Sequence, residues 1–240
     1  MNSPFRSQIL PIFPALAGLL GLLLRIWLFL SVDEKGLLPR NHFAGQLLFI
    51  LSAIVIVIIF LATRTLSAQT QPIFSPRSIN IAASFAGGFA LILNAVFIFL
   101  KSPVRLAMIA TIASVLSGLI LIVVAYLAKI GKRASYLFFA AVTVALMLNT
   151  VAQCQIWGAL PQIHEYFFPM MASVCLVMTA YQKTMFVARR PRPKLLAFFS
   201  QVAVYFCIVS LNSQQWPLYL GMLFWSAAQI LPCTAYKKKV

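Results

Sequence analysis

Long apolar runs, separated by short polar or charged breaks, alternate along this 240-residue chain. A helix needs about 20 apolar residues to cross roughly 30 Å of hydrocarbon, whereas a membrane barrel strand needs only about 10 alternating residues. The runs have 16 to 23 residues. They predict one integral membrane domain, an all-α polytopic helix bundle with about eight spans at residues 9–31, 44–62, 79–100, 106–127, 136–157, 166–181, 195–211 and 216–235.

The sixth and seventh runs are the weakest, because they have only 16 and 17 residues. A seven-span arrangement, in which one of these runs is re-entrant, therefore stays open. That arrangement would move the C-terminal residues Lys237, Lys238 and Lys239 to the side opposite the other basic loops. Eight spans keep both ends of the chain on one side.

Composition agrees with a lipid environment, since the chain is 62% hydrophobic and only 9% charged. An ordinary soluble domain has about 25% charged residues. Basic residues outnumber acidic ones by 19 to 3, but they lie in short loops, where Lys and Arg determine topology. We therefore predict no nucleic-acid binding.

The distribution of these basic residues predicts that both ends of the chain are cytoplasmic. This orientation places 14 basic residues inside and four outside. The inner set is Arg6, Arg64, Arg77, Lys129, Lys132, Arg133, Lys183, Arg189, Arg190, Arg192, Lys194, Lys237, Lys238 and Lys239, and the outer set is Lys35, Arg40, Lys101 and Arg105.

Eight spans in this orientation make four helical hairpins, and some of their sequences recur. Asn94 and Asn149 lie in similar contexts, Leu-Ile-Leu-Asn-Ala-Val and Leu-Met-Leu-Asn-Thr-Val, 55 residues apart. Ala-Tyr pairs recur at the same offset near the inner ends of return helices, at 125–126, 180–181 and 235–236. Repeated hairpins are one plan of secondary transporters. Coincidence in a chain rich in Leu, Ala and Val, with Tyr at the interface, is the alternative.

Arg25 is the only charged residue inside a predicted span. Ionisable groups in spans are costly and are candidates for function. Arg25 lies near the outer end of the first span, so its long side chain can reach the interface and pair with Asp33 or Glu34. Contact with a substrate or a lipid headgroup is the alternative interpretation.

Asn94 and Asn149 place amides in hydrocarbon, where they need partners on neighbouring helices. Bonds between helices are the simpler explanation. If the two residues are equivalent to Arg25, the three share a similar depth in the outer half. They would then line one cavity open to the outside and bind a substrate there.

The predicted outer loops contain a second polar cluster, formed by Asp33, Glu34, His42, His164 and Glu165. Two histidines and three carboxylates are ligand types for metals, but their spacing fits no compact metal motif. We therefore predict no metal site there.

Several enzyme classes lack their chemistry in this chain, because no predicted span contains Asp, Glu or His. Proton relays, aspartate-pair proteolysis and Ser-His dyads inside the bilayer all need such groups. No phosphate-binding loop occurs either. The sequence predicts a protein that is not an enzyme and that uses no cofactor.

Basic residues cluster in the largest cytoplasmic loop, at Arg189, Arg190, Arg192 and Lys194, and in the tail, at Lys237, Lys238 and Lys239. Setting the orientation is the simplest role of these clusters. They also predict attraction to anionic inner-leaflet lipids of the bilayer. Docking of a cytoplasmic or membrane protein partner is a further alternative.

The segment from Leu24 to His42 resembles the first span and loop of uncharacterised polytopic membrane proteins from anaerobic Gram-positive bacteria. The similarity rests on Leu-Arg-Ile-Trp-Leu and on Val-Asp-Glu-Lys-Gly-Leu-Leu-Pro-Arg-Asn-His and covers less than a tenth of the chain. It implies a bacterial plasma membrane and no particular activity.

Two functional hypotheses follow from these observations. The first is a small-solute permease or transport-related protein, based on the hairpins and on the alignment of Arg25, Asn94 and Asn149. The second is a non-transporting membrane subunit or sensor that recruits a partner through its basic loops, based on how few polar groups the spans contain.

Overall fold

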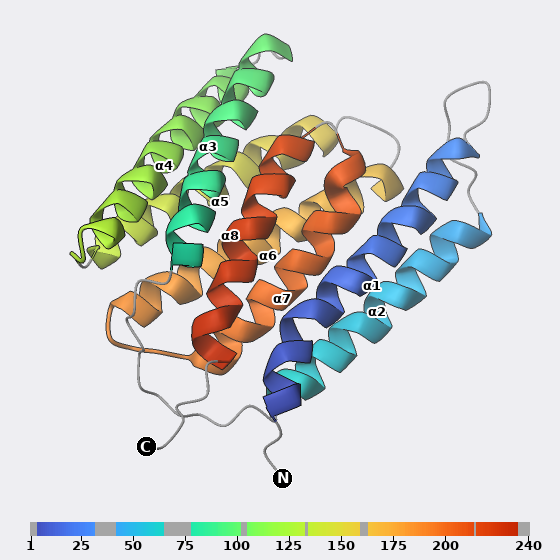
Figure 1. Ribbon diagram of the computed structural model, residues 1–240. Coiled ribbons are helices and arrows are strands. Elements are labelled where there is room, and N and C mark those ends of the chain that lie inside the picture. The colour runs from blue at the N-terminus through green and yellow to red at the C-terminus, as the bar shows by residue number, and fades with distance from the viewer. Residues whose placement is uncertain are drawn as a thin grey trace.

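The computed structural model describes residues 4–31, 42–64, 78–101, 105–132, 134–158, 163–213 and 215–234, and every regular element in these ranges is a helix (Figure 1). The predicted all-α membrane helix bundle is therefore confirmed. Its helices are α1 (Pro4–Leu30), α2 (Phe43–Arg64), α3 (Ser78–Lys101), α4 (Arg105–Lys129), α5 (Tyr136–Gly158), α6 (Ile163–Val187), α7 (Pro193–Val209), the 3-10 turn η1 (Ser210–Asn212) and α8 (Trp216–Thr234).

The largest difference from the predicted ranges is in α6, which has 25 residues and extends six residues beyond Tyr181. The added turn contains Gln182, Lys183 and Thr184, which an apolarity criterion excludes. Helix formation needs backbone hydrogen bonds rather than apolar side chains, and the Thr184 hydroxyl also donates to the Ala180 carbonyl at 2.9 Å. α6 is therefore not a short helix, although the sixth apolar run of the sequence has only 16 residues.

Within the described residues, α1 to α7 are long and apolar enough to cross a membrane. Of the described helices, α8 does not meet this criterion of length and apolarity. The sequence pattern had instead indicated the sixth and seventh runs as the weakest candidates for membrane spans. α8 packs against α3 and α7, and its residues Tyr219, Trp225, Ser226 and Gln229 are all buried. A helix surrounded by other helices can include polar groups that a lipid-facing helix must exclude.

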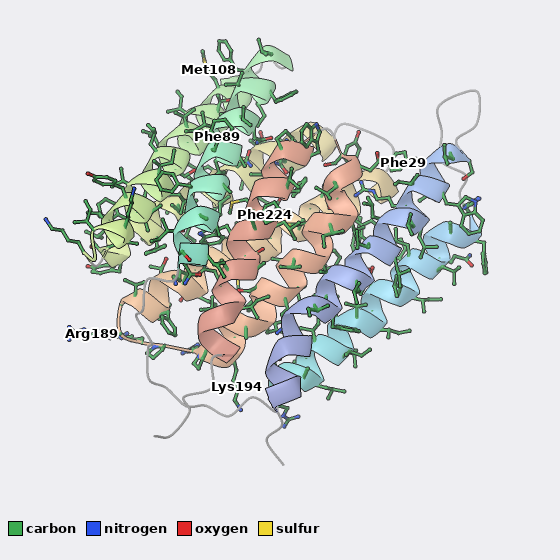
Figure 2. The ribbon with its side chains drawn as sticks, viewed as in Figure 1. Phe29, Phe89, Met108, Arg189, Lys194 and Phe224 are labelled. Atoms are coloured by element: carbon green, nitrogen blue, oxygen red, sulfur yellow. The ribbon has the colours of Figure 1, made fainter. Side chains whose placement is uncertain are left out.

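Six of the helices form a closed ring, because each helix from α3 to α8 contacts the next and α8 contacts α3. The α1–α2 hairpin lies outside this ring and packs on α7 (Figure 1). α7 is the most enclosed helix, since every residue from Ser200 to Ser210 is buried. Large apolar side chains such as Phe89, Met108 and Phe224 instead point outward and are more than half exposed (Figure 2).

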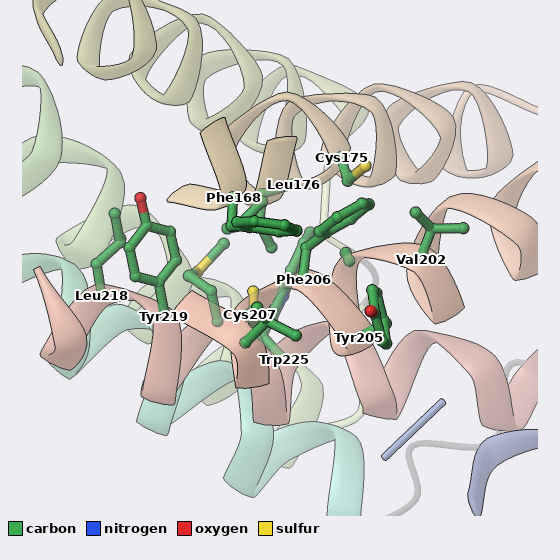
Figure 3. Packing of buried hydrophobic residues seen from close by; sticks show 14 of the residues in the cluster. Phe168, Cys175, Leu176, Val202, Tyr205, Phe206, Cys207, Leu218, Tyr219 and Trp225 are labelled. Atoms are coloured by element: carbon green, nitrogen blue, oxygen red, sulfur yellow. The ribbon is translucent and has the colours of Figure 1, made fainter. Parts of the chain in front are cut away.

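Aromatic and aliphatic side chains from α6, α7 and α8 fill the space where these helices meet (Figure 3). Phe168 of α6 lies beside Phe206 of α7, with 6.3 Å between ring centroids. Trp225 of α8 is fully buried in the same cluster. Burial of such rings gives the bundle a rigid centre in which any polar group needs a partner.

Successive helices run in opposite directions, so α1 begins and α8 ends at the same end of the bundle (Figure 1). At this end the Lys194 ammonium donates to the backbone carbonyl of Arg64, at 3.1 Å, and joins the start of α7 to the end of α2. We call it the basic end, because it has the exposed residues Arg64, Lys129, Lys132, Arg189, Arg190, Arg192 and Lys194. The opposite end is called the distal end.

We predict that Gly221→Ala separates α3 from α8. A Cβ atom at Gly221 would collide with the Cβ of Ala90 and would lie 2.9 Å from the carbonyl oxygen of Ala86. The clash should outweigh the better helix propensity of Ala and lower the free energy of unfolding by about 2 kcal/mol. Thermal unfolding of the purified protein in detergent, followed by tryptophan fluorescence, measures this change.

Gly45→Ala is the matched control, because the nearest atom to its new Cβ would be Leu28 Cδ1 at 3.8 Å, an ordinary contact. The control should melt at the original temperature or slightly above it. Equal melting temperatures for the two variants would show that α3 and α8 do not pack as closely as described.

Candidate functional site

Arg25 binds the end of the central helix. α7 ends at Val209, and the last carbonyl groups of a helix have no partner within it. The Arg25 Nη1 atom donates to the Val209 carbonyl oxygen at 2.9 Å. A cation at a helix C-terminus is also attracted by the helix dipole. Arg25 therefore holds the α1–α2 hairpin against the ring.

Small residues on α1 make this contact sterically possible. Gly21 lies one turn before Arg25, and a Cβ atom there would be 2.7 Å from a methyl group of Val209. The Arg25 guanidinium lies 5.6 Å from the ring centroid of Phe29 and 5.8 Å from that of Phe168. The two aromatic rings and the close approach of α1 to α7 together shield the guanidinium from solvent. Only 2% of Arg25 is exposed.

This position differs from the anchoring interpretation of Arg25, in which the side chain reaches the interface. A guanidinium that turns inward avoids the cost of an unpaired buried charge because Val209 supplies an acceptor. Asp33 and Glu34, the partners expected from the sequence, lie outside the described residues.

A second set of polar groups lies beside Arg25 and links α5, α6 and α8. The Gln153 amide donates to the Gln215 side-chain carbonyl, and Ser173 Oγ donates to Gln153 Oε1 at 3.3 Å. The Tyr219 hydroxyl lies 3.2 Å from Ser173 Oγ and donates to the Pro169 carbonyl at 3.1 Å. We call these side chains, Gln153, Ser173, Gln215 and Tyr219, the distal hydrogen-bond network.

The network and Arg25 are neighbours through α6. Phe168 packs against the guanidinium, and the next residue, Pro169, supplies the carbonyl that Tyr219 binds. These residues thus form one polar region inside the bundle.

Asn94 and Asn149 are buried as well, at 0% and 2% exposure. Within the part of the chain that the structure describes, both amide atoms of Asn94 and the Oδ1 atom of Asn149 have no hydrogen-bond partner. The Ser114 hydroxyl on α4 lacks one too. Burial of an amide without a bond costs a few kcal/mol. Among the described residues Asn94 is the one with two such atoms, and single buried atoms without a partner also occur at Ser200, Gln201 and Trp225.

The three residues proposed as equivalent are not brought into direct contact. Arg25, Asn94 and Asn149 lie on α1, α3 and α5, and no two of these helices touch. Asn94 and Asn149 are buried on α3 and α5, whereas the carbonyl that Arg25 binds belongs to the end of α7, which contacts neither of these two helices. The structure therefore separates Arg25 from the two amides.

The two amides lie at similar depth. With a rise of about 1.5 Å per residue, Asn94 is roughly 24 Å from the start of α3 and Asn149 roughly 20 Å from the start of α5. Ser114 is roughly 23 Å from the basic end of α4 by the same count. α4 contacts both α3 and α5, so Ser114 lies on the helix between the two amides.

The outer-loop cluster is described only in part. His42 precedes α2, its Nδ1 atom accepts a hydrogen bond from the Ala44 amide at 3.3 Å, and its ring packs edge-on against Trp27. His42 thus caps a helix. His164 and Glu165 are in the first turn of α6, but the positions of their side chains, like Asp33 and Glu34, lie outside the described residues.

The basic cluster of residues 189–194 lies at the basic end, between α6 and α7, where Arg189, Arg190, Arg192 and Lys194 are exposed. Figure 2 shows Arg189 and Lys194 on this side of the bundle. Lys237, Lys238 and Lys239 lie outside the described residues.

The distal hydrogen-bond network is the feature that sequence reasoning missed. Gln153 is an amide inside a predicted span, but Ser173, Gln215 and Tyr219 resemble ordinary packing or loop residues in a sequence. Pro169 is no signal for them, because a proline in a helix leaves the carbonyl four residues before it without a donor, whereas Tyr219 binds the carbonyl of Pro169 itself.

The fold and this interior define the class of protein: an integral, multi-pass helical membrane protein with buried polar groups in the distal half. No family model matches the chain, and neither the curated proteins nor the solved structures contain a match. The resemblance of residues 24–42 to bacterial membrane proteins stays a prediction.

We predict that Arg25→Leu lowers the free energy of unfolding by about 2 kcal/mol, because the Val209 carbonyl stays buried without a donor. Arg25→Lys should lower it by about 1 kcal/mol, since an ammonium cannot lie flat between Phe29 and Phe168 as a guanidinium does. Thermal unfolding in detergent measures both variants. If Arg25→Lys melts like the unmodified protein, any cation suffices and the anchoring interpretation is correct.

Proposed function

We propose that this protein is a permease for a small, uncharged polar solute, which binds in the distal half of the α3–α8 ring. The observation that carries the proposal is the pair of unsatisfied amides, Asn94 and Asn149, buried at similar depth on two helices of the ring. A small solute with hydroxyl or amide groups would supply the hydrogen bonds that these side chains lack.

The chemistry of the surrounding groups supports an uncharged solute. Asn94, Ser114 and Asn149 offer donors and acceptors without charge. The charge of Arg25 is directed to the Val209 carbonyl and enclosed by two rings, so it balances a helix end rather than a ligand. The cation nearest in sequence to either amide is Lys101, seven residues beyond Asn94 at the end of α3, or roughly 10 Å along the helix.

The position of these groups supports transport rather than catalysis. Transporters commonly bind their substrate inside the bundle between helical repeats. Acid-base chemistry needs a titratable group near the substrate, and Asn94, Asn149 and Ser114 do not titrate in the ordinary range. We therefore propose binding and passage of the solute without chemical change.

The exposed arginines at the basic end favour a second candidate function, in which a non-transporting subunit or sensor recruits a partner there. Arg189, Arg190 and Arg192 together form a strong positive surface. This candidate predicts a stable protein partner in mild detergent and no solute flux.

Flux through proteoliposomes tests the permease. Stopped-flow light scattering after an osmotic step would report the entry of glycerol, urea and xylitol. We expect at least one solute to enter faster than into protein-free liposomes. Asn94→Leu combined with Asn149→Leu should reduce that flux by about 10-fold or more, at about 1 kcal/mol per lost hydrogen bond, while thermal stability stays equal or rises because neither amide was satisfied.

Ser226→Ala is the matched control, since the Ser226 hydroxyl is buried but bonded to its own helix at the Met222 carbonyl, 2.7 Å away. This variant should keep the flux. If no solute enters faster than into protein-free liposomes, the permease is excluded, and co-purification of a stable partner would then support the second candidate.

A further inference from the structure

The end of α6 has a backbone conformation that its sequence does not favour. The Arg190 amide donates to the Met185 carbonyl at 3.0 Å, and the Ala188 amide donates to the Thr184 carbonyl at 2.9 Å. This pattern is a Schellman-type helix ending, in which the residue before Arg190 takes the left-handed conformation. That residue is Arg189, with φ of +62°, the only non-glycine residue with a positive φ in the described ranges.

Glycine is the usual residue at such a position, because a Cβ atom is strained there. Gly131, at the turn after α4, follows this rule with φ of +77°. An arginine at the corresponding position after α6 lowers the stability of the fold and needs a compensating role. Its side chain is exposed, so internal packing does not supply that role.

Other arginines surround Arg189 at the basic end. Arg190 and Arg192 follow it in the same turn, and both are exposed. We call these three residues of the turn, Arg189, Arg190 and Arg192, the arginine patch.

No acidic residue balances the arginine patch. The chain has three acidic residues, of which Asp33 and Glu34 follow the distal end of α1 and Glu165 lies in the distal first turn of α6. α6 therefore begins beside a carboxylate and ends beside three arginines. The compensating anions at the basic end must come from outside the chain.

We propose that the arginine patch binds the phosphate headgroups of anionic phospholipids. α6 has 25 residues, or roughly 38 Å of helix, which exceeds the roughly 30 Å of hydrocarbon, so its end lies at headgroup level. Guanidinium groups bind phosphate oxygens in pairs, and arginine does so better than lysine. The left-handed residue projects its guanidinium from the tip of the turn, where a headgroup has access.

The proposal predicts that stability and lipid binding change in opposite directions in Arg189→Gly. Removal of the Cβ relieves the strained conformation, so the melting temperature in neutral, lipid-free detergent should rise by about 2–4 °C. Loss of the charge should weaken binding of dioleoyl phosphatidylglycerol by about 5-fold, the factor that corresponds to about 1 kcal/mol per basic residue. Native mass spectrometry of the full chain in mixed micelles gives the bound fraction.

Two variants serve as controls. Arg189→Lys keeps both the charge and the strained backbone, so its melting temperature should be unchanged. Its lipid binding should lie between that of the original protein and that of Arg189→Gly, because an ammonium cannot bind two phosphate oxygens as a guanidinium does. Lys129→Gln removes one exposed charge from the basic end, at α4 and outside the patch, and should leave phosphatidylglycerol binding unchanged. Dioleoyl phosphatidylcholine, which has a phosphate but no net charge, should bind weakly to all variants.

Four outcomes would overturn the proposal. Equal losses for Arg189→Gly and Lys129→Gln would mean that basic residues act only as diffuse charge. Equal binding of the two lipids would remove the preference for anions. A lower melting temperature for Arg189→Gly would show that Arg189 stabilises the turn itself. Capture of an acidic protein without phosphatidylglycerol binding would favour partner recruitment instead.

Discussion

The hydrogen bond from Arg25 to the last carbonyl of α7 joins two parts of the bundle, the α1–α2 hairpin and the ring, which also meet through small and apolar contacts. α7 is short and almost wholly buried, so its C-terminal carbonyls end where there is no water to bind them. A guanidinium satisfies such an end because it combines charge with several donors in a plane. The α1–α2 hairpin can therefore pack on the ring without an orphaned helix end between them. The Ser52–Tyr205 hydrogen bond, at 2.8 Å, adds a second polar contact between the same two parts.

The interior polar groups divide into two kinds according to whether they have a partner. Arg25, Ser173 and Tyr219 bind backbone carbonyls or one another, and they hold helices in place. Asn94 and Asn149 lie in the same half of the bundle with amide atoms that bind nothing in the described residues. The first kind is expected of any membrane bundle, since bonds between helices replace bonds to water. The second kind costs stability, because a buried amide atom gives up its bonds to water without a replacement.

The sequence predicts the helices well because a span needs a long apolar run, which can be read directly from residue order. It does not predict features that depend on which helices contact one another. α8 has Trp225, Ser226 and Gln229 in its middle, which lower its apolar character, yet all three residues are buried in the bundle and do not face lipid. Arg25 was expected to reach for the interface because the sequence cannot show that a helix end lies inside. Asn94 and Asn149 were correctly expected to be buried, but their separation from Arg25 depends on which helices touch.

The two ends of the bundle differ in a way that sequence and backbone together explain. Counting charges predicts which end faces the cytoplasm, and for that purpose any basic residue is as good as another. Position 189 breaks this equivalence, because a left-handed helix ending favours glycine and the chain has arginine instead. A charge needed only for orientation could occupy a neighbouring position without strain. The left-handed backbone at this position fixes the direction in which the Arg189 side chain leaves the turn, and a fixed direction is a property that the proposed phosphate contact uses and diffuse charge does not.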